Sequence, residues 1–519
     1  MLSRRPLVPA IAKCNAAAVK LSVAASLLWA ASPALAAGQA PTDWPFSGHD
    51  IHNTRNAAGE SILDPSRVAS LKPLWTLTTD GNVSATPAVV DDVVYAPDFG
   101  GSLWAVDAAT GRVIWKSVVG DLTGVKGDVS RTTPAFWRGS LILGEGTQTV
   151  GSLEGASLFA VDAKSGRRLW LTKVEDNPVA IITSAPVADD GVVYVGTSSK
   201  AETINRPTGF RGSVVALSAE TGKVLWKTYL TPEGYTGAAA WGSTPVVDRD
   251  TGLLYVATGN NYSAPEGVCR APDVSGCTPS APDNYVDSIV ALDLKTGRVA
   301  WATGTLAGDV WTTYDRVDGP DYDFAQGPML FTATIDGRSA AVLGVGQKSG
   351  VYWALDPATG RVLWKTDVGP GSPLGGMMWG SATDGKRIYV SIGNAAHRAV
   401  TAPAPDGQAR TFTGGFWAAL DPSTGAILWR APDPQGALDV GALTVADGVV
   451  YAGSLAPQGN NMYALDAATG DFRWSFASGG SVAGGAAVVN GAVYWGSGYK
   501  IGSVSGPNNK LYAFSAPGN

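Results

Sequence analysis

The segment LWAVDAATGRVIW, residues 103–115, determines the fold because near-copies of it recur along the chain. Each copy has an apolar run, a turn of the Asp-x-x-Thr-Gly kind and a second run that ends in Trp. Further copies occupy residues 158–170, 214–226, 289–301, 352–364, 417–429 and 462–474. Asp and Thr side chains can bond to the backbone of such a turn and Gly adopts a positive φ, so each copy predicts a β-hairpin.

Two incomplete copies lie near the ends of the chain. Residues 511–515 (LYAFS) match the first strand of a copy, and residues 71–75 (LKPLW) match a second strand that lacks its first. We expect these two segments to pair, which makes an eighth copy and closes a ring of sheets. The sequence therefore predicts an all-β fold, an eight-bladed β-propeller of four-stranded antiparallel blades closed by pairing of its N- and C-terminal strands.

The composition agrees with short strands and tight turns. Only 16% of the 519 residues are charged, whereas Gly numbers 65 and Trp 18. Such a mixture suits aromatic packing between strands better than charged amphipathic helices. The net charge of −6 offers no basic surface, which argues against a nucleic-acid partner. The Trp and Gly residues of the repeat are expected to pack between blades, so function has to come from residues outside it.

The N-terminus has the pattern of an export signal. Arg4 and Arg5 precede an apolar run at residues 21–31, and Ala34-Leu35-Ala36 offers a small-residue cleavage site. We expect residues 1–36 to be a signal peptide and residues 37–519 to be one propeller domain. No later apolar run is long enough for a membrane span, so a periplasmic protein is expected. In that oxidising compartment Cys269 and Cys277 are expected to form a disulfide.

Several segments inserted between the repeats resemble those of the quinoprotein alcohol dehydrogenases. They include DWPFSGHDIHNTR (43–55), FRGSVVAL (210–217), GPDYDF (319–324) and MWGSATDGKRIYV (378–390). Within that family they are most similar to segments of the polyvinyl-alcohol dehydrogenases. The resemblance covers nearly the whole chain after residue 36, and it implies pyrroloquinoline quinone (PQQ) and Ca²⁺ on the propeller axis.

This chemistry sets requirements for the side chains. PQQ is a planar tri-anionic quinone, so it needs a flat aromatic surface and cationic or hydroxyl groups for its carboxylates. A hard cation beside its reactive carbonyl needs oxygen ligands. Oxidation of an alcohol also needs a base that accepts the hydroxyl proton.

The resemblance implies a metal site and a base. The implied metal ligands are Glu202, Asn260 and Asp323, and Asp323 is also the implied catalytic base. Asn261 remains open as the ligand in place of Asn260, and Asp321 remains open as the base. Relatives that use lanthanides carry an Asp two residues after the base, where this chain has Ala325, and this difference favours calcium.

The resemblance also implies a cofactor-binding set. Trp241 is the expected floor for the quinone, Lys348 the cation at its oxygens and Arg131 the partner of a carboxylate. Thr183 and Ser198 are the expected hydroxyl contacts, and Trp379 is expected at the pocket mouth. The chain lacks the adjacent cysteines of the methanol-oxidising members, so the second face of the cofactor has to be covered differently.

The expected activity is oxidation of secondary alcohols with PQQ and Ca²⁺. No CxxCH haem-attachment motif occurs in the sequence, so electrons are expected to pass to a separate c-type cytochrome. Long loops at 262–288, 307–328 and 400–414 suit a polymeric or bulky alcohol. The alternative is a non-catalytic propeller scaffold in outer-membrane protein assembly, which would need no convergence of Glu202, Asn260, Asp323 and Lys348 over Trp241.

Overall fold

The structure is a computed structural model. It describes residues 43–146, 154–201, 204, 208–269, 277, 281–313, 319–403 and 409–518. Residues 40–519 make up one compact unit. The predicted signal peptide, residues 1–36, and the predicted metal ligand Glu202 lie outside the described residues.

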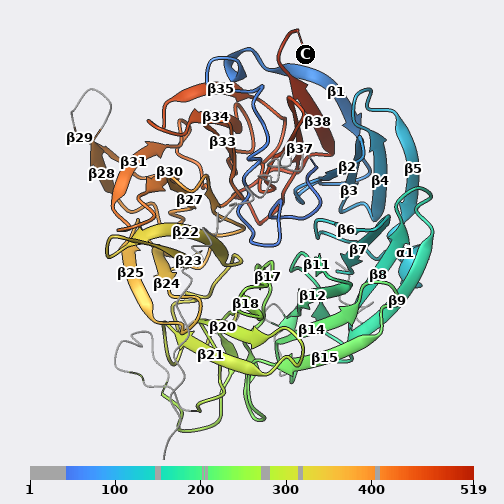
Figure 1. Cartoon of the computed structure of the whole chain (residues 1–519), viewed down its shortest axis with the longest axis vertical. Coiled ribbons are helices and arrows are strands. Elements are labelled where there is room, and N and C mark those ends of the chain that lie inside the picture. Colours follow the sequence, from blue (N-terminus) through green and yellow to red (C-terminus); the bar gives the residue numbers. More distant parts are fainter. Residues whose placement is uncertain are drawn as a thin grey trace, which may run out of the picture. The chain divides into compact units, whose positions relative to one another are not determined.

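Eight four-stranded sheets follow one another around a ring (Figure 1). Every strand pairs antiparallel with its neighbours in the blade. The predicted eight-bladed propeller of antiparallel blades is therefore confirmed.

The strands of the blades, from innermost to outermost, have the following bounds. The first four blades comprise β2 (Ala88–Val90), β3 (Val93–Pro97), β4 (Ser102–Asp107) and β5 (Val113–Val118); β6 (Ala135–Trp137), β7 (Ser140–Gly144), β8 (Ala156–Asp162) and β9 (Arg168–Glu175); β11 (Val187–Asp189), β12 (Val192–Gly196), β14 (Ser213–Ser218) and β15 (Val224–Tyr229); and β17 (Val246–Asp248), β18 (Leu253–Ala257), β20 (Ser288–Asp293) and β21 (Val299–Gly304). The last four comprise β22 (Met329–Ile335), β23 (Arg338–Gly346), β24 (Val351–Leu355) and β25 (Val362–Asp367); β26 (Ala382–Thr383), β27 (Ile388–Ile392), β30 (Phe416–Leu420) and β31 (Ile427–Pro432); β32 (Thr444–Ala446), β33 (Val449–Gly453), β34 (Met462–Asp466) and β35 (Phe472–Phe476); and β36 (Ala487–Val489), β37 (Ala492–Ser497), β38 (Lys510–Ser515) and β1 (Lys72–Thr78).

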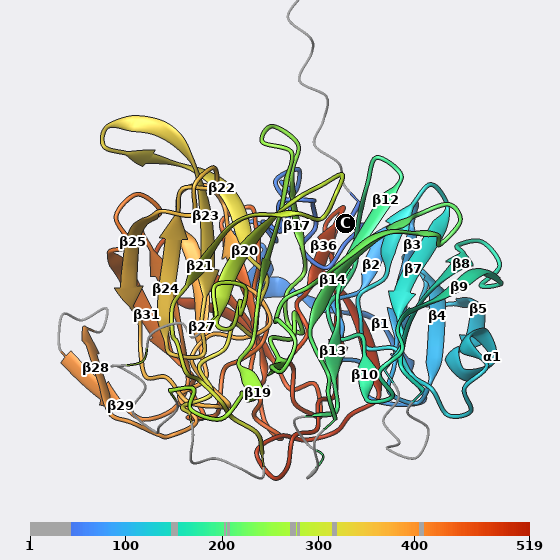
Figure 2. The ribbon, with the colours of Figure 1, turned by 90° about the horizontal axis from the view of Figure 1, so that it is seen from below.

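Three small sheets lie outside the blades, near one end of the ring (Figure 2). They pair β10 (Ala180–Ile181) with β13 (Ser198–Ser199), β16 (Thr236–Gly237) with β19 (Asn261–Ser263), and β28 (Val400–Pro403) with β29 (Ala409–Phe412). The helices of the described residues are the 3-10 turn η1 (Val68–Ser70) and α1 (Val119–Thr123). Neither is long and apolar enough to cross a membrane.

The last blade takes strands from both ends of the chain. β1 pairs antiparallel with β38, with Trp75 opposite Ala513, and β38 pairs with β37. The predicted closure of the ring by its terminal strands is confirmed, and it leaves the ring without an open sheet edge at the seam.

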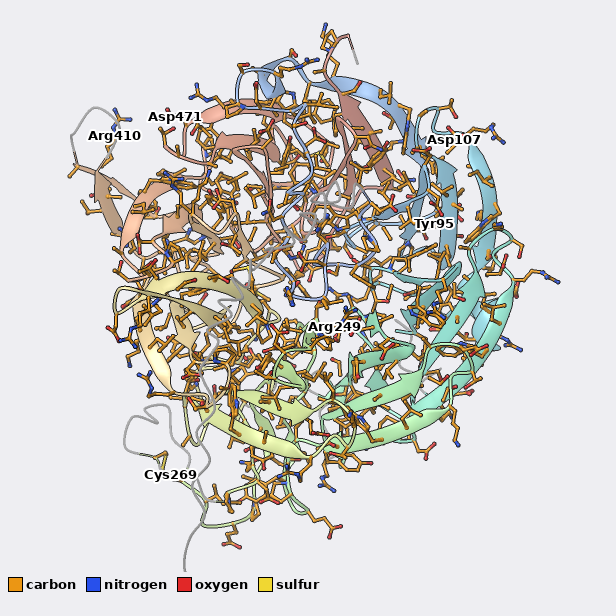
Figure 3. The ribbon with its side chains drawn as sticks, viewed as in Figure 1. Tyr95, Asp107, Arg249, Cys269, Arg410 and Asp471 are labelled. Atoms are coloured by element: carbon orange, nitrogen blue, oxygen red, sulfur yellow. A yellow bond between two sulfur atoms is a disulfide. The ribbon has the colours of Figure 1, made fainter. Side chains whose placement is uncertain are left out.

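The repeat turns behave as the sequence predicts. In the turn after β4, Asp107 Oδ1 accepts hydrogen bonds from the backbone N and the Oγ1 of Thr110, at 2.9 and 2.7 Å. Figure 3 shows Asp107 and Asp471, which lie in or beside such turns, near the outside of the ring. The hairpin prediction is therefore confirmed with the chemistry on which it rested.

The Trp residues of the repeat join each blade to the next. Each indole Nε1 donates to a backbone carbonyl of the neighbouring blade or of the chain entering it, over 2.8–3.2 Å. The donors are Trp75, Trp115, Trp170, Trp226, Trp301, Trp364, Trp429 and Trp474. Eight equivalent contacts thus encircle the propeller, which confirms that these residues pack between blades.

The apolar core lies between the blades. Inner strands such as β17 and β36 are buried along their whole length, whereas outer strands such as β21 alternate between exposed and half-buried residues. Figure 3 labels Tyr95, whose hydroxyl donates to the carbonyl of Ala163 in the next blade at 3.3 Å. Arg249, also labelled there, forms a two-pronged ion pair with Asp189 of the preceding blade. Both apolar and polar contacts therefore hold adjacent blades together.

The segment before η1, residues 44–57, contacts the inner strands of six blades. Its backbone hydrogen bonds reach Val89, Phe136, Val247, Leu330, Thr383 and Val445. Figure 1 shows this stretch, in blue, over the middle of the ring. A short piece of chain thereby fills the space around the axis that the inner strands leave open.

The expected disulfide between Cys269 and Cys277 is present. Figure 3 shows Cys269 at the periphery of the ring, beyond β20 and β21. A Cβ on Gly308 would lie 2.7 Å from the carbonyl oxygen of Cys269, so the cystine packs against the chain just before Asp309.

Candidate active site

The predicted site residues come from two kinds of loop. Arg131, Thr183, Trp241 and Asp323 precede the inner strands β6, β11, β17 and β22, respectively. Ser198, Asn260 and Lys348 lie between the second and third strands of their blades. In a propeller these two kinds of loop lie at the same end of the ring, which brings residues distant in sequence together.

The centre of the site is a buried group of one lysine and two aspartates. Lys348 Nζ lies 2.8 Å from Asp321 Oδ1 and 2.6 Å from Asp323 Oδ1. The exposed fraction is 5% for Lys348, 1% for Asp321 and 2% for Asp323. One cation faces two carboxylates away from water, so the group carries an excess of negative charge.

Trp241 contacts this group directly. Its indole Nε1 donates to Asp323 Oδ2 at 2.6 Å, and Lys348 Nζ lies 5.2 Å from its ring centroid. The ring of Trp379 stands nearly perpendicular to that of Trp241, at 87° and 5.2 Å between centroids. The structure thus brings Trp241, Asp323 and Lys348 together, with Trp379 beside them.

Asn260 follows a glycine that lies against Asp323. A Cβ on Gly259 would come within 2.9 Å of Asp323 Oδ2. The Asn260 amide donates to the carbonyls of Asn261 and Trp311, both at 2.8 Å, which fixes the side chain. Among the described residues nothing donates to its Oδ1, so that oxygen is available to a cation.

The neighbouring Asn261 is engaged in structural contacts. Its amide donates to the carbonyl of Thr236 at 2.8 Å, and its Oδ1 accepts from Asn284 at 2.9 Å. Both ends of the Asn261 side chain are occupied, so the geometry favours Asn260 over Asn261 as a metal ligand.

The full metal-ligand set cannot be assembled from the described part of the chain, because Glu202 lies outside it. Within the described part, no group of three or more His, Cys, Asp or Glu residues is arranged to hold a metal ion. The donors present, a carboxylate on Asp323 and an amide oxygen on Asn260, are the hard oxygen ligands that Ca²⁺ prefers.

Two further buried aspartates lie beside this group, and the sequence reasoning missed both. The carboxylate of Asp309 accepts from the backbone N of Tyr322 at 2.8 Å and of Asp321 at 3.3 Å, so it holds the loop that carries the predicted base. Burial raises the pKa of Asp309 to about 6. Sequence reasoning missed Asp309 because a loop carboxylate is ordinarily solvated, and only the fold shows that this one is buried.

Asp287 is the second of these aspartates. It is fully buried, and neither carboxylate oxygen has a hydrogen-bond partner among the described residues. Burial raises its pKa well above the usual range, and the charges of Asp309 and Asp323 raise it further. The carboxylates here outnumber the one neighbouring lysine, an imbalance that a divalent cation would relieve.

Cationic and hydroxyl groups lie near the same indoles. The guanidinium carbon of Arg131 lies 4.7 Å from the ring centroid of Trp379 and 5.8 Å from that of Tyr499. Burial lowers the pKa of Lys200, and the nearby positive charge of Arg131 lowers it further. Lys200 was also missed, because one lysine in a loop carries no distinguishing pattern.

The two residues predicted to contact the cofactor through hydroxyl groups, Thr183 and Ser198, lie close together at the small sheet of β10 and β13. Thr183 Oγ1 donates to the carbonyl of Trp241 at 2.7 Å, which ties it to the predicted floor. Ser198 is 5% exposed and pairs through its backbone with Ile181, two residues before Thr183. Thr183 therefore joins the site directly, and Ser198 lies on the strand paired with the one that leads to it.

A small cavity on the axis tests whether PQQ fits these residues. It has a volume of about 50 Å³, and Arg131, Thr183, Gly242 and Trp379 line it. Among the described residues that line it, none is Asp or Glu. The buried Nε1 of Trp379 has no hydrogen-bond acceptor among the described residues. Cations, hydroxyl groups and the Trp379 indole are donors that a planar tri-anion requires, so the chemistry of the lining suits the group, and a volume of about 50 Å³ admits only a small part of it.

The fold and this donor set define a propeller of the quinoprotein class, with its polar loops gathered at one end of the axis. The chain belongs to the PQQ-dependent alcohol dehydrogenase family, since residues 44–372 match the family described as glucose/ethanol/alcohol dehydrogenase, beta-propeller domain. Residues 414–516 match a second description, outer membrane protein assembly factor BamB.

Curated relatives agree with that assignment. A polyvinylalcohol dehydrogenase of Sphingopyxis sp. (strain 113P3) is 31% identical over 80% of this chain and 64% of its own length. A polyvinylalcohol dehydrogenase of Pseudomonas sp. is 29% identical over 92% of this chain and 78% of its own length. The quinohemoprotein alcohol dehydrogenase ADH-IIG of Pseudomonas putida is 30% identical over 80% of this chain and 59% of its own length. The chain thus spans less than two thirds of two of these relatives.

Solved structures share the fold. The quinohemoprotein alcohol dehydrogenase ADHIIG of Pseudomonas putida HK5 superposes with a TM-score of 0.71 at 22% identity, covering 92% of this chain and 81% of that one. A europium-containing methanol dehydrogenase gives 0.67 at 16% identity, covering 92% of this chain and 99% of that one.

Proposed function

We propose that this protein is a periplasmic dehydrogenase that oxidises secondary alcohols with PQQ and Ca²⁺. The observation that carries the proposal is the contact of Asp323 with both Trp241 and Lys348 in one buried group. Alcohol oxidation at a bound quinone requires a base, a cation and an aromatic surface that contact one another.

In this proposal Trp241, Lys348, Arg131, Thr183 and Ser198 hold the cofactor. When bound, PQQ supplies the two-electron acceptor for the hydride that leaves the alcohol carbon. Arg131 offers a guanidinium suited to a carboxylate, and Thr183 holds Trp241 in place through its carbonyl.

Asp323 is the proposed base. Its carboxylate accepts the hydroxyl proton of the alcohol, while Trp241 Nε1 fixes one oxygen and Lys348 Nζ the other. Asp321 binds the same ammonium group and thereby positions Lys348. Burial of all three keeps water from competing for the proton.

Ca²⁺ is assigned to Glu202, Asn260 and Asp323. The orientation of Asn260, with its amide hydrogens engaged and its Oδ1 available, supports this assignment. The excess of buried carboxylates around Lys348 supports a divalent cation at this position.

The proposed substrates are bulky or polymeric secondary alcohols, and the proposed electron acceptor is an exported c-type cytochrome. Two relatives carry the name polyvinylalcohol dehydrogenase, which supports that substrate class. The second candidate is a scaffold in outer-membrane protein assembly, favoured by the BamB match at residues 414–516. None of the predicted site residues lies in that stretch.

Reconstitution tests the proposal. The protein without cofactor is mixed with PQQ and CaCl₂, and dye-linked oxidation of secondary alcohols of graded size is measured. We expect activity only with both additions, and loss of activity after chelation with restoration by Ca²⁺. Tight PQQ binding without turnover of any alcohol would contradict the proposed reaction, and no PQQ binding at all would favour the scaffold.

A further inference from the structure

Arg55 is a buried cation on the propeller axis. It lies near the end of the segment 44–57 that crosses the inner strands, and it is 2% exposed. Nη2 donates to Ser47 Oγ at 3.0 Å and to the carbonyl of Trp379 at 3.4 Å, and Nη1 lies 3.5 Å from Thr86 Oγ1. Nε has no acceptor, and no ion pair to Arg55 occurs within the described part of the chain.

The surrounding backbone leaves room for this guanidinium. A Cβ on Gly380 would overlap Arg55 Nε, and a Cβ on Gly485 would lie 3.0 Å from Nη1. These glycines come from two different blades, so the space around Arg55 is formed by the ring as a whole. A side chain on Gly380 or Gly485 would occupy the space that the Arg55 guanidinium fills.

The cavity of about 50 Å³ opens onto Arg55. Besides the guanidinium Nε, the buried Ser84 Oγ and Trp379 Nε1 lack hydrogen-bond partners among the described residues, and both residues line the same cavity. Arg131 adds a second cation to the lining, whose described residues include no Asp or Glu. Three residues with unused polar atoms therefore line one cavity, and no carboxylate occurs among its described lining residues.

The charge on Arg55 persists at neutral pH. Burial lowers the pKa of Arg55 to about 10, which still leaves the guanidinium protonated at pH 7. A buried ion without a partner costs several kcal/mol, and hydroxyl oxygens offset only part of that cost. A bound anion would supply the neutralising charge.

We propose that this axial cavity is an anion-binding site, in which Arg55 holds one small monovalent anionic group, either a halide ion or a single carboxylate. A cavity of this size accommodates a few water molecules or one halide. A carboxylate of the cofactor would reach it from the side lined by Arg131 and Trp379. The halide form is independent of the proposed dehydrogenase activity, whereas the carboxylate form rests on it.

The test uses the whole chain without cofactor, the variant R55M and the matched control R211M. Arg211 donates to the carbonyl of Thr231 and does not line the cavity, so its removal reproduces the substitution elsewhere. Thermal unfolding is measured in NaCl and NaBr against sodium gluconate at equal ionic strength. We expect a saturable rise in Tm with chloride or bromide for the wild type and R211M, and none for R55M.

A PQQ titration, followed by quenching of Trp fluorescence, identifies the carboxylate form. If halides leave the wild-type Tm unchanged but R55M weakens PQQ binding tenfold or more relative to R211M, the anion is a cofactor carboxylate. If halides have no effect and R55M binds PQQ as R211M does, the proposal is wrong.

Crystals decide the matter should R55M fail to fold. Wild-type crystals soaked in bromide, and others grown with PQQ, are compared by anomalous and ordinary electron density. A bromide or a carboxylate within hydrogen-bond distance of the Arg55 guanidinium supports the site. Water alone beside Arg55 in both crystals would overturn it.

Discussion

Among single residues, Asp321 and Asp323 are the hardest to tell apart from sequence, because they are two positions apart and share Lys348. The structure separates them by their other contacts. Asp323 also meets Trp241 Nε1 and the backbone at Gly259, whereas the backbone N of Asp321 donates to Asp309. Asp323 therefore faces the aromatic surface, and Asp321 positions the lysine.

This difference predicts unequal effects of removing either charge. D323N is expected to lower the rate of alcohol oxidation by roughly 10²–10⁴-fold, the usual contribution of a general base. PQQ binding should persist in that variant. D321N is expected to lower the rate less, since Lys348 keeps its contact with Asp323. Dye-linked rates and PQQ titrations of both variants check this, and a larger loss of rate in D321N would reverse the assignment.

A buried aspartate outside the candidate site, Asp439, makes the free energy of unfolding depend on pH. It is fully buried between β31 and β32, and burial followed by the charge of Asp433 raises its pKa well above the usual range. The folded protein therefore holds a proton that the unfolded chain releases above about pH 4. Its contribution to stability is greatest at low pH and is lost as the pH rises toward the folded-state pKa.

The variant D439N is expected to flatten that dependence. Because the pKa of Asp439 is raised in the folded protein, the free energy of unfolding is expected to fall less from pH 5 to pH 8 in D439N than in the wild type. Urea unfolding at the two pH values measures it, with D367N, at an exposed position of β25, as the control. Parallel pH profiles in D439N and D367N would contradict the prediction.

Sequence patterns predicted candidate site residues inside recognisable segments and missed the buried residues that lie beside them. Trp241, Asp323 and Lys348 were predicted and do meet. Asp287 and Arg55 were not assigned a role, because an isolated Asp or Arg is ordinarily solvated. Their importance arises from neighbours that other blades supply, and the sequence does not show which side chains those are.

Within the blades, the repeat predicted both the hairpins and the contacts between them. A local turn motif fixes its own geometry, and the Trp that follows it meets the turn glycine of the next complete copy. For example, Gly360 lies so close to Trp301 that an added Cβ would overlap the indole ring. The crossing segment at residues 44–57 and the three small sheets were not predicted, because their pairing depends on where the ring brings distant loops.

Alanine substitutions at Gly360 and Gly337 distinguish the cost of backbone strain from the cost of a packing clash. Both have positive φ, 72° and 77°, but nothing lies within 4 Å of a Cβ on Gly337. G337A is expected to cost about 1–2 kcal/mol of unfolding free energy from backbone strain alone. G360A should cost about 1–3 kcal/mol more, because the added methyl group meets Trp301. Chemical denaturation of both variants measures the difference, and equal losses would show that the Trp contact contributes nothing.

For the molecule as a whole, the seam at β1 is the place where the ring is closed without a covalent link. Every other blade comes from one continuous stretch of chain, but β1 joins β38 from the opposite end of the chain. Trp474 donates to the carbonyl of Leu71, just before β1, at 3.0 Å. Trp301 makes the equivalent contact to Pro357 at 3.1 Å, between two blades that each come from one continuous stretch of chain.

This asymmetry predicts different kinetics for the same substitution at the two positions. W474F and W301F each remove one hydrogen bond, so each is expected to lower the free energy of unfolding by about 1 kcal/mol. Loss of the Trp474 bond also loosens the strand that has to detach before the ring opens. We therefore expect W474F to accelerate unfolding several-fold more than W301F, with faster amide exchange in β1 and β38. Stopped-flow unfolding and hydrogen exchange measure both effects. Equal unfolding rates would mean that the propeller opens elsewhere, and that the terminal strands are not its first point of failure.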